Sequence, residues 1–505
     1  MLNQPVDDDF AQLISSGGDN RLRLGPMGLN RYGSGPNAGS KIQFGSCTCS
    51  SPSPRALVAA HRLYLELKQH PSPALLVSEH FEIVRNRLQN LLALPADIDI
   101  ALIPSGTDVE MLALALVASK TEQPIVNIVV GPAEVGSGTS DASAGCYFNS
   151  LTPRGNSSTA QQPVDTDLAA RVSVTHVDVR NTFGQQMSID EIDREVVEAV
   201  IGAVATGAHV VVHLVAHSKT GIHAPSLNAI ESIKSALQED VTIVVDAAQG
   251  RLAIDAYRIA LKNDCFVSFT GSKFFGGPSF CGALLVPKSQ RPGKHLTQLP
   301  DGFNEFFNRD SMPVAWDSWR TACSDWTNVG LLLRWTAAIA EIEAFYETEM
   351  DDREVVFFSF ANEVANAISA SRSCSMLVTD TDKASNLPDI SAYCSVFAFE
   401  VNNLNETPLS NTQLKDLHQQ LNTNPKFGFL IGQPVQLGQN RCVLRVAIGA
   451  SMIVDLVTNT NFGKTFDHRL SWLRENIRSC FKAIDSLVLG DAQFKDSTFV
   501  EIAQP

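Results

Sequence analysis

Seven short apolar runs, separated by longer helix-like segments, fill the stretch between residues 98 and 287. The runs are IDIALIPS, PIVNIVVG, VSVTHVDV, HVVVHLVAH, VTIVVDAAQ, CFVSFTGS and GALLVP, and the segments between them include Asp108–Ser119, Asp190–Thr206 and Ser226–Glu239. Runs this apolar indicate strands that are buried on both faces. Their alternation with helices predicts βαβ units, and therefore an α/β domain with a mainly parallel, seven-stranded sheet flanked by helices.

The stretch before this core follows other patterns. Residues 1–50 are rich in Gly, Pro and Ser, and the run KIQFGS within them is strand-like. Pro54–Gln69 and about Pro73–Leu94 carry apolar residues at i, i+3 and i+4, which predicts two amphipathic helices. We therefore expect an N-terminal arm over residues 1–55 and a large α/β domain over residues 56–325.

The remaining residues, 326–505, predict a smaller C-terminal α+β domain. NVGLLLRWTAAIAEIEAFYETEM, residues 328–350, predicts one long helix that links the two domains. SVFAFEV and RCVLRVAIG are weaker strand signals, and Asp467–Leu487 predicts a closing helix. A chain of 505 residues that is 44% hydrophobic can bury the core that two or three domains require.

Charge and composition exclude several classes of partner. The net charge of −15, without a block of basic residues, argues against nucleic acid and against a polybasic membrane anchor. No apolar run reaches about 18 residues and the first ten residues are acidic, so we expect no membrane span, no secretory signal and a cytoplasmic location. The ten cysteines lack C-x-x-C spacing, which favours reduced thiols over disulfides or zinc. Cys47-Thr-Cys49 is interpreted as structural or as lining of a substrate site, so no metal is expected.

One lysine, Lys273, lies within the apolar and glycine-rich run VSFTGSKFFGGPSFCGALLVP. A buried lysine loses hydration worth several kcal/mol, so it persists where it is paired, deprotonated or covalently used. A lysine at a strand end more often extends its charged end to solvent. A phosphate-binding P-loop is excluded because Gly271-Ser272 precede the lysine and Phe274 follows it.

A carboxylate and an amide end the preceding strand of the pattern. Asp246 lies at the tip of VTIVVDAAQG, and Gln249 follows three residues later. Taken alone, Asp246 would more often cap the next helix. However, Asp246 precedes Lys273 by 27 residues, the length of one helical crossover, so both side chains fall at the same edge of the sheet, where ligands bind. A carboxylate that faces a lysine across a cofactor is therefore plausible.

Asp-x-x-Gln at a strand end, then Ser-Lys, then Gly-Gly-Pro and an apolar strand together resemble the pyridoxal 5'-phosphate (PLP) site of fold-type I enzymes. The pattern is most similar to the class V aminotransferase and cysteine desulfurase family, whose lysine segment reads His-Lys-x-x-Gly-Pro-x-Gly-x-Gly-x-Leu. The resemblance implies that Lys273 forms the aldimine with PLP and moves the substrate's α proton. It further implies that Asp246 keeps the pyridine nitrogen protonated and that Gln249 donates to the phenolic oxygen.

Other cofactor-binding residues follow from the same resemblance. Ser105-Gly106-Thr107 lies between a strand and a helix, where a phosphate can bind to the helix N-terminus; a helix cap at Thr107 or Asp108 is the open alternative. The resemblance assigns this turn to the PLP phosphate and adds the hydroxyls of two residues that flank the lysine. It places HLVAHSKTGIHAP beside the cofactor ring. The added candidates are Thr270 and Ser272 at the phosphate, and Ser218, Thr220 and His217 at the ring.

The chain departs from the family at the residue that covers the ring. The family has a histidine after the strand that follows the phosphate turn, whereas this chain reads VVGPAEVGSGTSDA. Either Val135 or a residue of Gly136–Thr139 would then cover the ring.

Substrate-binding residues are expected at two further places. SCTCSSPSPRAL occupies the position of the family's N-terminal pocket segment, which assigns Ser46 and Thr48 to the substrate, although a serine-rich helix start explains it equally well. CVLRVAIGA resembles the segment whose arginine binds the substrate α-carboxylate, which assigns Arg445; a lone arginine in a strand is more often at the surface.

Thr327 resembles a threonine that reaches the neighbouring subunit's cofactor phosphate, so a homodimer with shared sites is implied. Compared with the family, residues within about 301–320 are an insertion that could reshape the pocket entrance.

An aminotransferase that acts on an amino acid or a related amine is the favoured function. A PLP-dependent lyase that breaks a carbon–sulfur or other α,β bond is the alternative, and a PLP-binding homologue without turnover is a third. A cysteine desulfurase is a less favoured alternative. It needs a thiol on a mobile loop, and the corresponding region, NPKFGFLIGQPVQLGQN, has none, while Cys442 is too close to Arg445 and lies within a strand.

Overall fold

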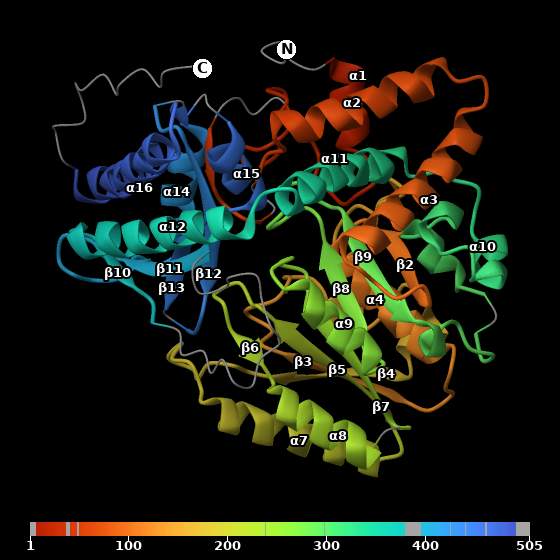
Figure 1. Ribbon diagram of the computed structural model, residues 1–505. Coiled ribbons are helices and arrows are strands. Elements are labelled where there is room, and N and C mark those ends of the chain that lie inside the picture. Colours follow the sequence, from red (N-terminus) through yellow and green to blue (C-terminus); the bar gives the residue numbers. More distant parts are fainter. Residues whose placement is uncertain are drawn as a thin grey trace.

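A computed structural model of the chain describes residues 7–36, 41–47, 50–237, 239–296, 298–378, 395–424, 426–439, 441–459 and 462–490. Two β-sheets, each covered by helices, lie side by side (Figure 1). The larger sheet is formed by the central part of the chain. The smaller sheet is formed by the C-terminal part together with one strand from near the N-terminus.

All seven predicted strands are present in the larger sheet. Its order is β2 (Ile98–Ile103), β9 (Gly282–Pro287), β8 (Phe266–Thr270), β7 (Val241–Ala247), β5 (His209–Ala216), β3 (Ile125–Val130) and β4 (Val172–Val177). The pairs from β8 to β4 are parallel, and β9 is antiparallel to both of its neighbours. The short β6 (His223–Ala224) pairs with the end of β5. The predicted mainly parallel α/β sheet is therefore confirmed.

Successive residues of these strands point to opposite faces, and each face has its own core. Val212, Val245 and Phe269 belong to one cluster, with residues of α7 (Ile189–Ala205), α8 (Leu227–Leu237) and α9 (Ile254–Lys262). Val211, Val244 and Phe266 belong to a second cluster, with α4 (Gly106–Ala118). Both faces are thus covered, which is why the strands are continuous apolar runs.

The helices expected from periodicity are present with shifts of a few residues at their ends. They are α2 (Pro54–Gln69), α3 (Pro73–Leu91), α4, α7, α8 and α16 (Phe466–Leu489). Short helices α5 (Thr139–Ser143) and α6 (Thr166–Ala169) follow β3.

The predicted helix over residues 328–350 is present as α11, which ends at Tyr346, four residues earlier than expected. α11 covers Val329–Tyr346 and α12 begins at Met350 and runs to Ala370. The Thr348 hydroxyl donates to the Phe345 carbonyl at 2.7 Å, and the Thr348 N–H bonds the same oxygen. This turn closes α11 and redirects the chain, so α11 packs on α2 while α12 packs on α16.

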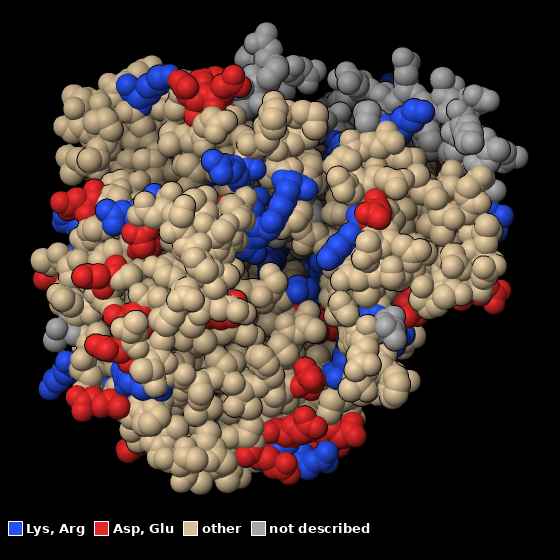
Figure 2. All heavy atoms as spheres, turned by 180° about the vertical axis from the view of Figure 1, so that it is seen from behind, with Lys and Arg blue, Asp and Glu red and all other residues tan. Residues whose placement is uncertain are grey.

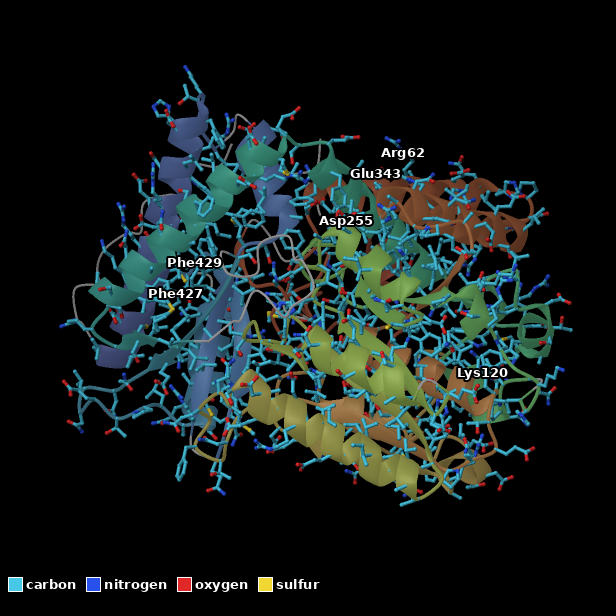
Figure 3. All side chains as sticks on the ribbon, turned by 60° about the horizontal axis from the view of Figure 1, so that its bottom comes forward. Arg62, Lys120, Asp255, Glu343, Phe427 and Phe429 are labelled. Atoms are coloured by element: carbon cyan, nitrogen blue, oxygen red, sulfur yellow. The ribbon has the colours of Figure 1, made fainter. Side chains whose placement is uncertain are left out.

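The N-terminal arm contributes to both halves of the molecule. α1 (Asp8–Ile14) packs on α11, whereas β1 (Ile42–Phe44) is the edge strand of the small sheet and pairs in parallel with β12 (Phe429–Gln436). Phe44 stacks on Phe429, with ring centroids 6.0 Å apart, and Phe429 lies on the small-sheet side of the molecule (Figure 3). The strand-like run KIQFGS is therefore a strand.

The small sheet has the order β1–β12–β13–β11–β10, where β10 is Cys374–Met376, β11 is Val396–Val401 and β13 is Cys442–Ala447. Helices α12, α14 (Asn411–Thr423), α15 (Ala450–Thr458) and α16 cover it (Figure 1). The segment that the resemblance matched to a mobile loop, 424–440, contains strand β12 in its middle. Both predicted C-terminal strands are present, as β11 and β13.

The segment expected to be an insertion, near residues 301–320, packs into the core of the large domain; its effect on the pocket entrance stays a prediction. It forms three short helical turns, η2 (Asp301–Glu305), η3 (Arg309–Ser311) and α10 (Asp317–Ala322). Phe303, Phe307 and Trp319 are fully buried in the cluster that contains α4. The aromatic side chains of this segment explain its position, because they cover α4, which would otherwise be exposed on that side.

No helix in the described part of the chain is long and apolar enough to cross a membrane.

Candidate active site

A cavity of about 280 Å³ lies at the carboxyl ends of β5, β7 and β8. Its lining combines large-domain residues with Gln433, Pro434, Val435 and Arg445 from the small sheet. Lys and Arg side chains gather around a hollow near the centre of the corresponding face (Figure 2). The sequence-predicted residues that line the cavity are Ser105, Gly106, Thr107, Ser218, Asp246, Gln249, Thr270, Ser272, Lys273 and Arg445, with His217 beside them.

Lys273 and Asp246 are brought together by neighbouring strands. Asp246 pairs with Ser268 of β8 in the sheet register, and Lys273 follows the end of β8 by three residues. The Asp246 carboxylate accepts a hydrogen bond from the Ala248 N–H at 3.0 Å. Burial lowers the pKa of Lys273, and the nearby Asp246 charge opposes that effect while Arg445 adds to it. A larger fraction of the amine is therefore neutral than in a solvent-exposed lysine.

The glycines after Lys273 are required by a tight turn against α11. Gly276 has a φ of +75°, and its N–H bonds to the Lys273 carbonyl at 3.2 Å. A side chain at Gly277 would place its Cβ 2.7 Å from Ala338 Cβ and 2.8 Å from the Gly271 carbonyl oxygen. Glycine is therefore the residue that fits both positions, and the turn fixes where Lys273 lies.

The turn before α4 is capped by Ser105, not by Thr107 or Asp108. The Ser105 hydroxyl accepts from the Thr107 and Asp108 N–H groups, each at 3.2 Å, and donates to the Asp108 carboxylate. A Cβ on Gly106 would lie 3.2 Å from Ala248 Cβ, so the turn is tightly packed on the loop after β7. Burial raises the pKa of Asp108 to about 7, although the Ser105 hydroxyl opposes the shift.

Thr270 and Ser272 supply two hydroxyls to the cavity, and Thr270 lies next to the turn before α4. Thr270 donates to the Ala248 carbonyl at 2.6 Å, and Ser272 lies next to Lys273. Arg21, from the N-terminal arm, also lines the cavity; Asp19 holds its guanidinium, with Nε 2.9 Å from both carboxylate oxygens. A helix N-terminus, hydroxyls and an arginine form a donor set that suits a phosphate.

Thr220 does not line the cavity, contrary to the prediction. Its hydroxyl lies 2.8 Å from both oxygens of Glu134, and its N–H bonds to the same carboxylate. Ser218 lines the cavity, but its hydroxyl donates to Glu134 at 2.8 Å. Arg180 completes the network, with its Nε 2.7 Å from Glu134. Ser218 and Thr220 are therefore bonded to the buried ion pair of Glu134 and Arg180. Glu134 precedes them by 84 and 86 residues in the chain.

We expect Glu134→Gln to lower the free energy of unfolding by about 3–5 kcal/mol, because Arg180 would be left as an uncompensated buried charge. Chemical denaturation compared with the parent chain measures the loss. Glu198→Gln, at an exposed position of α7, is the matched control. Equal unfolding midpoints for both variants would contradict a structural role of the pair.

Arg445 points to the cavity from β13. It is buried, and its guanidinium donates to the carbonyls of Lys219 at 3.1 Å and Gln433 at 3.4 Å. Both partners are neutral. Within the described residues Nε has no hydrogen-bond partner, so the group retains donors and its full charge for an anion.

Lys219 is a further cation in the cavity, and sequence reasoning missed it. It follows Ser218 at the end of β5, is half-buried and donates to the Ala133 carbonyl at 3.3 Å. Burial lowers its pKa to about 8; the nearby Arg445 and Lys273 add to the shift, and Glu134 and Asp246 oppose it.

The segment expected to cover a cofactor ring does border the cavity, through Val135, Gly136, Ser137 and Thr139. The remaining predicted residues lie elsewhere. Ser46 is buried but does not line the cavity, whereas Cys47 does. Thr48 lies outside the described residues. Thr327 is exposed, just before the N-cap of α11, and outside the cavity of its own chain.

Cys47, which the sequence offered as structural or as lining of a substrate site, does line the cavity. The cavity residues that sequence reasoning did not assign are Arg21, Glu134, Val215, Lys219, Ala248, Ser279, Phe280 and Gln433–Val435. No local signal marks Arg21, whose place depends on how the N-terminal arm folds back. Lys219 could have been found, because it lies between two residues already assigned to the site. Among the described residues, no group of three His, Cys, Asp or Glu side chains could hold a metal ion.

No protein-family model matches the chain, and no curated protein sequence matches it. Solved structures do. The cysteine desulfurase from Thermococcus onnurineus NA1 matches with a TM-score of 0.54 and 14% identity, over 90% of this chain and 96% of its own. TDC from Oryza sativa, solved with PLP and tryptamine, matches with a TM-score of 0.52 and 12% identity, over 88% of this chain and 84% of its own.

The phosphoserine aminotransferase SerC from Cytophaga hutchinsonii matches with a TM-score of 0.50 and 11% identity, over 87% of this chain and 99% of its own. These likenesses establish the fold of the chain, which is that of the fold-type I PLP-dependent enzymes. The matched structures include a cysteine desulfurase and an aminotransferase, so the reaction has to be argued from the site.

Proposed function

We propose that the chain is a PLP-dependent aminotransferase that acts on an amino acid or a related amine. The observation that carries the proposal is the meeting of Lys273 and Asp246 in one cavity, beside the N-terminus of α4. A lysine with a lowered pKa, a carboxylate and a phosphate-binding turn are the three groups that hold PLP. The structure solved with PLP among the matches supports the same cofactor.

The side chains present fit this cofactor. Asp246 accepts one backbone hydrogen bond and otherwise faces the cavity, where its charge can hold a protonated pyridine nitrogen. Gln249 lines the same wall and can donate to the phenolic oxygen. Ser105–Thr107, Thr270 and Ser272 would hold the phosphate, and Val135 would lie against the ring. When bound, PLP supplies an aldehyde for Lys273 and an electron sink for charge that develops at the substrate's α-carbon.

Each of three residues of the chain has a separate role in this proposal. Lys273 would anchor the cofactor, and its amine would take the α proton of the substrate. Arg445 would bind the substrate carboxylate through its planar guanidinium. Asp246 would hold a positive charge at the ring. We infer a homodimer in which the exposed Thr327 of one subunit completes the phosphate site of the other.

The cysteines favour transamination over sulfur transfer. Of the cysteines that the structure describes, Cys47 alone lines the cavity. Cys442 lies in β13 and is buried, and burial raises the pKa of its thiol. A raised pKa reduces the thiolate fraction, so Cys442 is a poor nucleophile. The segment 424–440, which the resemblance matches to the thiol-carrying loop of a desulfurase, has no cysteine.

Incubation of the holoenzyme with a panel of amino acids tests the reaction. Transamination predicts conversion of the cofactor to its pyridoxamine form and release of the matching 2-oxo acid. Release of pyruvate or sulfide, with the cofactor unchanged, would instead indicate a lyase. No spectral change with any amine would indicate a PLP-binding homologue without turnover.

We expect Arg445→Lys to raise the KM for α-amino acids by about 10- to 100-fold, because hydrogen bonds to charged groups contribute roughly 1.5–3 kcal/mol and lysine lacks the planar fork. Steady-state kinetics measure the change. An amine substrate without a carboxylate is the control, and its KM should stay within about twofold. Equal effects on both substrates would show that Arg445 does not bind the carboxylate.

A further inference from the structure

We propose that the substrate carries a second anionic group on its side chain, a carboxylate, sulfonate or phosphate, and that Lys219 binds it. The inference rests on the proposed function and goes beyond it by naming a substrate class and a specificity residue.

The cavity has more cations than anions, although the whole chain has a net charge of −15. Arg21, Lys219, Lys273 and Arg445 line it, against Glu134 and Asp246. Figure 2 shows the same local excess as Lys and Arg side chains around the central hollow. An excess of buried positive charge in an acidic protein indicates that an anionic ligand completes the site.

Most of these charges either have a partner in the structure or would gain one from the cofactor and the substrate of the proposed function. Glu134 is neutralised by Arg180, and its oxygens are occupied by Ser218 and Thr220. Asp19 holds Arg21 at the phosphate end. Asp246 balances the pyridine nitrogen, Lys273 is used by the cofactor, and Arg445 binds the α-carboxylate. Lys219 is the cation that remains.

Lys219 lines the cavity beside Arg445, the residue proposed to bind the α-carboxylate. Its backbone carbonyl accepts from Arg445 at 3.1 Å, so the two cations are adjacent on one wall of the cavity. Its Nζ has one hydrogen bond, to the neutral Ala133 carbonyl, and it forms no ion pair in the part of the chain that the structure describes. The charges that face it are Arg445, Glu134, Lys273 and Asp246.

A neutral substrate would desolvate Lys219 without giving it a partner, which is costly. A substrate with a second anion would pair with Lys219 and would also relieve its repulsion from Arg445. The geometry therefore points to amino acids with an acidic side chain as the preferred substrates.

The test compares matched pairs of substrates on the holoenzyme: aspartate with asparagine, glutamate with glutamine, and phosphoserine with serine. We expect the acidic member of at least one pair to have the higher kcat/KM by about 10-fold or more. Lys219→Met should remove that preference, because the kcat/KM of the acidic member should fall to that of the neutral member or below it. The preference should also decline as the pH rises through about 8, where Lys219 loses its proton.

Lys120→Met is the matched control. Burial also lowers the pKa of Lys120 to about 8, but this lysine donates to the Ser289 carbonyl at 3.0 Å and lies at the far end of the large domain (Figure 3). Its substitution should leave the substrate preference unchanged.

Binding supplies a readout that does not depend on turnover. Calorimetry should show that the holoenzyme binds succinate more tightly than propionate, and that Lys219→Met removes the difference. Equal kcat/KM values within every pair, or a preference that survives in Lys219→Met, would overturn the inference while leaving the aminotransferase proposal intact. Absence of turnover with every amine would overturn the proposed function, and the succinate comparison would still decide the role of Lys219.

Discussion

Lys273→Ala is expected to lower turnover by at least about 10³-fold while leaving the chain folded. The substitution removes both the covalent anchor of the cofactor and the amine that moves the α proton, and a positioned general base alone contributes about 10²–10⁴-fold. The side chain is half-buried at a cavity wall, so its loss removes little core packing. Turnover with the best substrate from the amino-acid panel measures the effect.

Lys262→Ala is the control, because Lys262 is exposed at the end of α9 and outside the cavity. Circular dichroism and thermal unfolding should be the same for both variants and the parent chain. Activity of Lys273→Ala within tenfold of the parent enzyme would refute the role of Lys273. Loss of folding in this variant alone would show that the lysine is structural.

Asp246→Asn is expected to lower kcat by about 10²- to 10⁴-fold with the cofactor still attached. Asparagine has nearly the same volume and can still accept from the Ala248 N–H, so only the negative charge is removed. Without that charge the pyridine nitrogen loses its proton more readily, and the ring stabilises the transition state less well. Electrostatic stabilisation of this kind is commonly among the largest contributions to catalysis.

The measurement for Asp246→Asn combines kcat with the cofactor content of the purified protein. Asp255→Asn is the matched control; Asp255 is exposed on α9 (Figure 3) and pairs with Arg258 at 3.4 Å. A kcat within tenfold of the parent enzyme, at full cofactor content, would show that Asp246 does not tune the ring.

Most strands of the large sheet were predictable because both of their faces are buried; the edge strand β4, in which only Val177 is buried, is the exception. Parallel strands under two helical layers are continuous apolar runs, and the seven runs between residues 98 and 287 all form strands of one sheet. The meeting of Asp246 and Lys273 followed from the same regularity, since consecutive parallel strands end at one edge. Local sequence therefore determined this part of the fold and of the cavity.

Contacts between distant segments were not predictable in the same way. β1 pairs with β12, nearly 390 residues later, and a strand of three residues carries too little periodicity to reveal its partner. Thr220 was assigned to the cofactor because its segment resembles a family motif beside the cofactor ring, whereas in the structure its hydroxyl bonds to Glu134 and Arg180. The hydrogen-bond partners of a polar side chain often come from distant segments of the chain, and the sequence of one segment does not show them.

The same reason explains the other differences. The aromatic residues near 301–320 were interpreted as an insertion by the pocket, whereas Trp319 and its neighbours fill the space beside α4. Arg21 reaches the cavity because α1 packs on α11 and the chain then turns back. The break between α11 and α12 depends on the hydrogen bonds of Thr348, which apolar periodicity does not register.

The covalent attachment of PLP to Lys273 is the claim on which the rest depends, and one measurement tests it directly. The protein is incubated with PLP, reduced with borohydride, digested with trypsin and analysed by mass spectrometry. Because trypsin does not cleave at a substituted lysine, the account predicts a peptide from Asn263 to Lys288 that carries one reduced cofactor at Lys273. Cleavage after Lys273 with no cofactor on any lysine, or a cofactor found on another lysine, would contradict it.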